Sequence, residues 1–151
     1  MPFTEQNSTT AHPLERFLAI LGAAACLLIT IVIWRSVSAY QNMWPLPALY
    51  LIELPAVSLV AALMLTHGGT SVGFITWAAV GVLVAFSFVG AFSIGFFYLP
   101  VALLFLILSI AHDVRCKQHV LAHIGGCLLA ALAQAAIMFG AIQLLYPTAV
   151  F

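Results

Sequence analysis

The residue with the most unusual chemical setting is Glu53, because it lies inside a long apolar part of the sequence. Between Ser36 and His112 it is the only formally charged side chain. An ionised carboxylate in hydrocarbon costs several kcal/mol unless it is paired or hydrated. Three interpretations stay open for Glu53: an ion pair with Arg35, a protonated acid that donates to a carbonyl freed by Pro55, and a step in an ion or proton pathway.

A row of cysteine and histidine residues is the second group that could do chemistry. Cys116, His119, His123 and Cys127 are spaced three, four and four residues apart, so on a helix they share one face. The row extends ~16 Å along the helix axis at 1.5 Å per residue. That is too long for one metal ion, whose ligand bonds are about 2.0–2.3 Å.

Only His119 and His123 are close enough to share a metal ion or a haem. Two histidines one turn apart supply two ligands, and His67 or His112 would have to supply the others. The sequence does not fix how these two approach the pair. We therefore expect no metal, no haem and no other cofactor, and we interpret the histidines as polar residues at a membrane interface.

The rest of the sequence has no motif that indicates a reaction type. It lacks a glycine-rich phosphate loop followed by lysine, a Gly-x-Ser-x-Gly elbow and a Cys-x-x-Cys-His haem attachment signature. We assign no catalytic residue and expect the protein not to be an enzyme. The three cysteines are expected to be free thiols.

Composition places these residues in a membrane. Of 151 residues, 65% are hydrophobic and 5% are charged, against roughly 45–50% and about 25% in soluble domains. Four Lys plus Arg balance four Asp plus Glu, so there is no basic surface for nucleic acid. The sequence predicts an all-α integral membrane protein whose partners are the lipid bilayer and other membrane-protein subunits.

Two spans precede the first clear turn. An apolar run over residues 17–34 is long enough to cross a hydrocarbon core ~30 Å thick. Residues 36–43 are polar enough for a loop, and a second span is predicted over 46–66. The segment 67–71 contains two adjacent glycines and predicts a turn.

The apolar stretch 72–111 is too long for one span, because forty residues of helix would measure ~60 Å. We expect a hairpin at 90–95 that separates spans over 72–89 and 96–111. Residues 112–118 predict a polar loop, and a fifth span follows over 119–145. Without the hairpin the chain would have four spans.

The last span is rich in small residues, including Gly126, Ala130, Ala136 and Gly140. Small residues let helices approach closely in lipid, so this span is predicted to be the central helix. Gln134 on the same span needs a partner, because an unpaired amide in hydrocarbon costs a few kcal/mol.

The predicted organisation is a polar N-terminal tail over 1–13, one transmembrane domain over 14–146 and a short C-terminal tail over 147–151. With the N-terminus inside the cell, Arg16, Arg115 and Lys117 face the cytoplasm and only Arg35 lies outside, as expected in an inner (plasma) membrane. Four spans with an outside N-terminus also place three of the four cations inside. In the five-span topology all five histidines lie near the cytoplasmic face and all four tyrosines near the outer face.

Two function classes remain. The first is a non-catalytic structural or assembly subunit of a larger membrane-protein complex. The second is a small oligomeric transporter or channel for an ion or solute, with Glu53 in its pathway. Five short spans with one intramembrane acid and no internal repeat favour the first class, since transporters commonly show duplicated halves.

Overall fold

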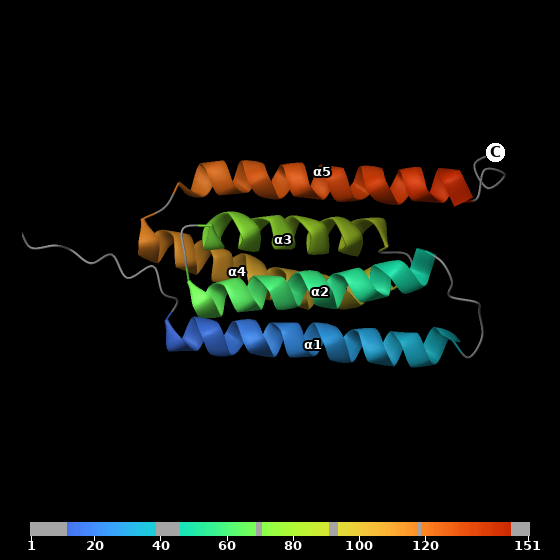
Figure 1. The fold of residues 1–151 in the computed structure, drawn as a ribbon, viewed down its shortest axis with the longest axis horizontal. Helices are drawn as coiled ribbons and strands as arrows, with labels where there is room; N and C mark the ends of the chain where they lie inside the picture. The colour runs from blue at the N-terminus through green and yellow to red at the C-terminus, as the bar shows by residue number, and fades with distance from the viewer. Residues whose placement is uncertain (1–11, 39–45, 69–70, 91–93, 118, 146–151) are drawn as a thin grey trace, which may run out of the picture.

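The fold is an all-α membrane bundle. The computed structural model describes residues 12–38, 46–68, 71–90, 94–117 and 119–145. These residues form helices and connecting turns, with no strand among them, in the order α1 (Pro13–Ser38), α2 (Leu46–His67), α3 (Val72–Val89), the 3-10 turn η1 (Gly95–Tyr98), α4 (Leu99–Cys116) and α5 (Val120–Leu145). Five helical segments are long and apolar enough to cross a membrane. They run side by side in alternating directions (Figure 1).

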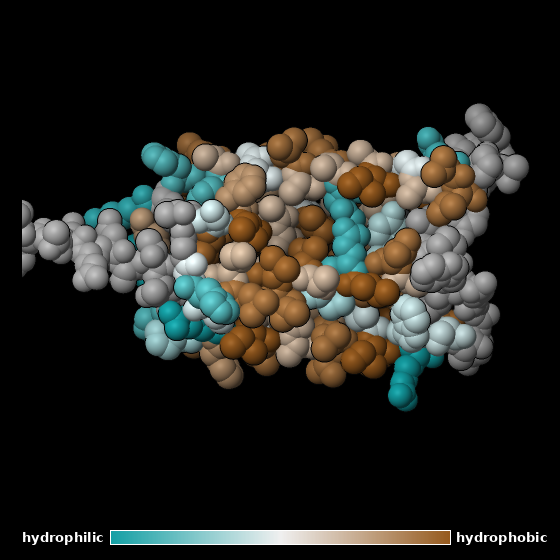
Figure 2. Space-filling view, viewed as in Figure 1, coloured by the Kyte–Doolittle hydropathy of each residue, from teal (hydrophilic) through white to brown (hydrophobic). Residues whose placement is uncertain are grey.

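The surface has the distribution of polarity that a membrane requires. Apolar side chains cover most of the middle of the bundle, and hydrophilic side chains gather at its ends (Figure 2). Large exposed apolar side chains occur on every helix, for example Leu28, Leu49, Phe88, Ile107 and Leu132. In water such a surface would promote aggregation, whereas in a bilayer it faces lipid.

The predicted hairpin at 90–95 is confirmed, although its residues 91–93 lie outside the described residues. The Gly90 N–H donates to the Phe86 carbonyl oxygen at 2.8 Å, and the Gly95 N–H donates to the Gly90 carbonyl oxygen at 2.7 Å. A Cβ atom at Gly95 would lie 2.6 Å from the Phe86 carbonyl oxygen. Glycine at this position therefore lets the chain close the turn between α3 and η1.

The predicted loop over 112–118 is wrong for most of its length. Helix α4 continues to Cys116, and Lys117 directly after it adopts the left-handed conformation with φ of 50°. In this last turn Asp113 and Arg115 bond to residues of other helices. The helix also begins later than predicted, at Leu99, because Phe96 belongs to the 3-10 turn.

Helix α3, and not α5, is the central helix. It contacts α2, α4 and α5, whereas α5 packs mainly on α3 and touches α4 only slightly. On α5 only Gln134 and Met138 are buried, and the helix lies at the edge of the bundle (Figure 1). Helix α5 does pack closely against a neighbour, but only on the side that faces α3. A Cβ atom at Gly81 of α3 would overlap the Cys127 carbonyl oxygen of α5.

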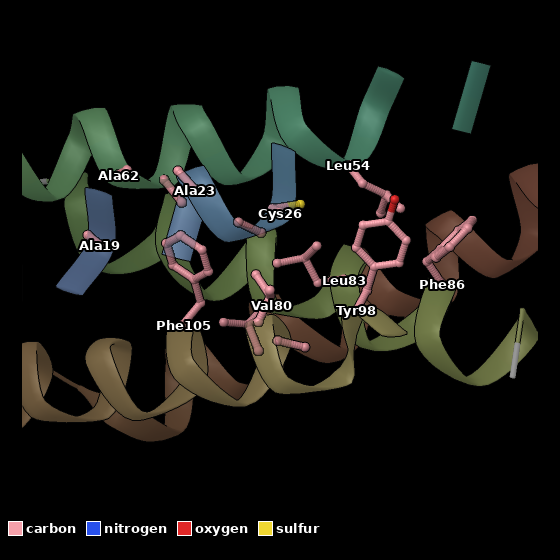
Figure 3. Packing of buried hydrophobic residues seen from close by; sticks show 14 of the residues in the cluster. Ala19, Ala23, Cys26, Leu54, Ala62, Val80, Leu83, Phe86, Tyr98 and Phe105 are labelled. Atoms are coloured by element: carbon pink, nitrogen blue, oxygen red, sulfur yellow. The ribbon is translucent and has the colours of Figure 1, made fainter. Parts of the chain in front are cut away.

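The core lies between α1, α2, α3 and α4. Phe105 of α4 is fully buried and lies beside Ala23 of α1 (Figure 3). Gly22 of α1 leaves room for it, since a Cβ atom there would lie 3.2 Å from the Phe105 ring. Tyr98 is also fully buried; its ring meets the Phe86 ring edge-on at 5.6 Å, and its hydroxyl lies 2.9 Å from the Thr30 hydroxyl. The buried phenol is thus satisfied by a hydrogen bond, as buried polar groups require.

Candidate functional site

Glu53 bonds to Gln134, which lies eighty-one residues further along the chain. The Gln134 Nε2 group donates to Glu53 Oε2 at 3.1 Å. Gln134 is buried, while Glu53 is partly exposed. Helix α3 lies between α2 and α5 and packs against both, so this bond joins its two neighbours. The partner that the sequence requires for Gln134 is therefore Glu53.

The structure does not bring Glu53 together with Arg35. Arg35 is exposed near the end of α1, and no hydrogen bond or salt bridge joins it to Glu53 among the described residues. Pro55 lies within α2. Within the same described ranges, no hydrogen bond runs from Glu53 to a backbone carbonyl. Neither of the two structural explanations offered from the sequence accounts for the position of this acid.

A second polar group surrounds Asp113 at the opposite end of the bundle. Asp113 is fully buried, and its Oδ2 atom accepts a hydrogen bond of 2.7 Å from Trp77 Nε1 of α3. The same Oδ2 atom lies 2.7 Å from His123 Nδ1 of α5. Its Oδ1 atom has no hydrogen-bond partner among the described residues. Asp113 therefore ties three helices together.

Sequence reasoning missed Asp113 because it assigned this residue to a loop. A signal was present in the buried face of α4, where Phe105, Ser109 and His112 recur at helical spacing. Asp113 continues that face at one turn beyond Ser109. Extending the helical period past the end of the apolar run would have predicted a buried acid.

A third polar group joins α1 to α4. Arg115 donates from Nε to Glu15 Oε1 at 3.1 Å and from Nη2 to Glu15 Oε2 at 2.7 Å. Glu15 also accepts a bond from the backbone N–H of His12 at 3.0 Å. His112 is buried beside this pair, with Nδ1 at 3.3 Å from Arg115 Nη2. A bidentate carboxylate–guanidinium contact of this kind fixes both the position and the orientation of the two side chains.

The histidines are distributed over different places. His112 and His123 belong to the two groups just described, His119 is exposed, and His67 lies against the carbonyl of its own helix at Leu63. No group of three or more His, Cys, Asp or Glu among the described residues is placed to hold a metal ion. The absence of metal and haem stays a prediction.

The hydroxyls of Ser58, Thr76 and Ser109 each donate to a carbonyl of their own helix. All three cysteines are free thiols, as predicted. Comparisons of the chain with protein-family models, with curated proteins and with solved structures found no match. The functional conclusion therefore rests on the geometry.

Proposed function

We propose that the protein is a non-catalytic structural or assembly subunit of a larger membrane-protein complex. We place it in the inner (plasma) membrane with its N-terminus in the cytoplasm. The observation that carries the proposal is the outward face of α5. As part of this proposal, we also infer that the protein is not an enzyme.

The outward face of α5 carries glycine and alanine residues among large exposed apolar ones such as Leu129, Leu132 and Phe139. Gly125, Ala133, Ala136 and Gly140 are all exposed. At 100° per residue Gly125 and Ala136 lie opposite buried Gln134, while Gly140 and Ala133 lie about 120° and about 100° from it. A Cβ atom at Gly125 or Gly140 would meet nothing within 4 Å. In the chain alone this side of α5 is uncovered.

Lipid contact gives no reason for glycine at these positions, since glycine costs about 1 kcal/mol relative to alanine inside a helix. Small residues are favoured where another helix approaches closely in the membrane. The inward side of α5 follows this rule, because Gly81 of α3 lies directly against the Cys127 backbone. By the same reasoning the outward side suits a helix of another subunit.

The transporter or channel class receives less support. Glu53 lies in α2 near the end where α1 finishes, while Asp113 lies near the opposite end of the bundle. The serine and threonine hydroxyls between these levels bond to their own helices. The cavities described between the helices are lined almost wholly by apolar side chains. A pathway for ions would need a polar lining between the two acids.

The charges support the proposed orientation. Arg16 and Arg115 lie at the end of the bundle where α1 begins, together with Lys117, and Arg35 lies at the other end. Three of four cations on one side fit a cytoplasmic face. Tyr50 and Tyr98 lie toward the end that this orientation places outside.

Site-specific photo-crosslinking in the native membrane tests the proposed function. A photoreactive phenylalanine at Ala136 should form an adduct of defined mass with a different membrane protein. Ile107 is the matched control, because it is exposed on α4 away from α5, and the same group there should give only lipid adducts. Equal results at the two positions, or an Ala136 adduct consisting of two copies of this chain, would contradict the proposal.

A further inference from the structure

A shallow groove lies on the face that α2 and α3 form together. It has a volume of about 310 Å³ and is lined only by aliphatic side chains, including Ala56 and Val60 of α2 and Ala78, Ala79 and Val82 of α3. We call it the α2–α3 groove. Its alanines leave the backbones of both helices accessible to a third helix, which is the condition for close packing in lipid.

Glu53 lies about one helical turn before Ala56 and Val57, the first α2 residues that line the α2–α3 groove. Ala56 follows it by three residues on α2, so both project from the same side of that helix. The bond from Gln134 draws the carboxylate toward α5 and across α3. Figure 2 shows a hydrophilic patch in the apolar middle of the surface, in the region between α5 and α2 in this view.

The carboxylate of Glu53 is not matched by a cation. Among the described residues the salt bridges involve Glu15 and Asp113 as the acids, and Glu53 takes part in none. One hydrogen bond from an uncharged amide leaves most of the acceptor capacity of a carboxylate unused. A partly exposed acid at this depth in hydrocarbon is costly unless a partner meets it.

We propose that the α2–α3 groove receives a transmembrane helix of another subunit, and that a lysine or arginine of this helix pairs with Glu53. The proposal rests on the proposed function and names the kind of partner. We infer a basic residue because it would complement the charge of Glu53, and we infer a helix because the groove is lined by small aliphatic side chains. Glu53 lies seven residues after the start of α2, so the basic residue would lie ~10 Å inside that end of the bundle at 1.5 Å per residue.

Photo-crosslinking from the groove tests the proposal in the native membrane. The photoreactive group is placed at Val60, which is exposed and lines the groove. It should capture a subunit whose transmembrane helix carries Lys or Arg at the stated depth. The Glu53→Gln variant keeps the size of the side chain and an acceptor for Gln134. It should reduce the adduct about tenfold or more, because a buried charge pair loses one member.

Three further variants and one unfolding measurement separate the loss of the charge pair from a folding defect. Exchanging the charges, with Glu53→Arg and the basic residue of the partner changed to Glu, should restore the adduct. Ala78→Leu fills the groove and should abolish it, while Ala111→Leu on the exposed side of α4 should not. Thermal unfolding of the purified Glu53→Gln chain should match the parent chain, which shows that the loss is not a folding defect.

Three results would overturn this inference: no adduct from Val60, an adduct of two copies of this chain, or a captured helix without a basic residue. An adduct that survives Glu53→Gln undiminished would overturn it as well. If Ala136 captures a subunit and Val60 does not, the proposed function stands and this inference fails. If neither position captures a subunit, both fail.

Discussion

Gly81 is the position where one added carbon should disturb the bundle most. In Gly81→Ala the new methyl group would overlap the Cys127 carbonyl oxygen and lie 3.1 Å from the Ala131 nitrogen. Both obstacles are backbone atoms of α5, so no side-chain rotation relieves them. Ordinary van der Waals contact requires α5 to withdraw from α3 by ~1 Å.

The energetic effect follows from two opposing terms. Alanine is favoured over glycine by about 1 kcal/mol inside a helix, while overpacking a well-packed contact costs typically 1–3 kcal/mol and occasionally more. The withdrawal would also lengthen the Gln134 to Glu53 bond, which spans α3. We expect the overpacking to prevail and Gly81→Ala to unfold at a lower temperature than the parent chain in detergent.

Two other glycines supply graded controls. At Gly126 a Cβ atom would lie 2.9 Å from the Phe74 ring, a side chain that can move, and at Gly140 it would meet nothing within 4 Å. The expected order of Tm is Gly140→Ala highest, Gly126→Ala intermediate and Gly81→Ala lowest. A Gly81→Ala chain as stable as Gly140→Ala would refute the close contact between α3 and α5.

Three further predictions concern the polar groups and the orientation. Arg115→Ala should lower the free energy of unfolding by about 1–3 kcal/mol, because charged hydrogen bonds are lost, and replacing Glu15 by Leu in the same chain should recover part of the loss in a double-mutant cycle. Asp113→Leu should lower the Tm more than Asp113→Asn, which keeps an acceptor for the indole N–H, and equal losses would contradict the hydrogen bonding there. In a chain with its native cysteines removed, Ser38→Cys should react with an impermeant thiol reagent outside the cell and Ser71→Cys should not; the reverse pattern would invert the proposed orientation.

Hydropathy and turn residues were enough to predict the helices. The span over 72–89 coincides with α3 because glycines bound it on both sides, and the hairpin at Gly90 follows from the length of hydrocarbon that one helix can cross. The end of α4 was misjudged because polar residues after an apolar run normally indicate a loop. Here Asp113 and Arg115 stay helical because partners on other helices satisfy them.

The positions of the helices within the bundle could not be predicted from composition. Small residues occur in several spans, and only the close contact at Gly81 identifies which of them face each other. Likewise, the sequence indicates that Glu53 and Gln134 each need a partner, but their eighty-one-residue separation conceals that they satisfy one another. Pairing across a bundle is a property of three-dimensional packing and not of local pattern.

The mass of the particle that contains this chain in its native membrane tests the central claim most directly. The membrane is extracted with a lipid-preserving polymer, the particle is isolated through a tag on this chain, and its mass and chain composition are measured by native mass spectrometry. Membership of a larger complex predicts a mass well above 16.2 kDa, made up of this chain and different membrane proteins in a fixed ratio. A particle that contains only this chain, alone or as a whole-number multiple of 16.2 kDa, would contradict the claim.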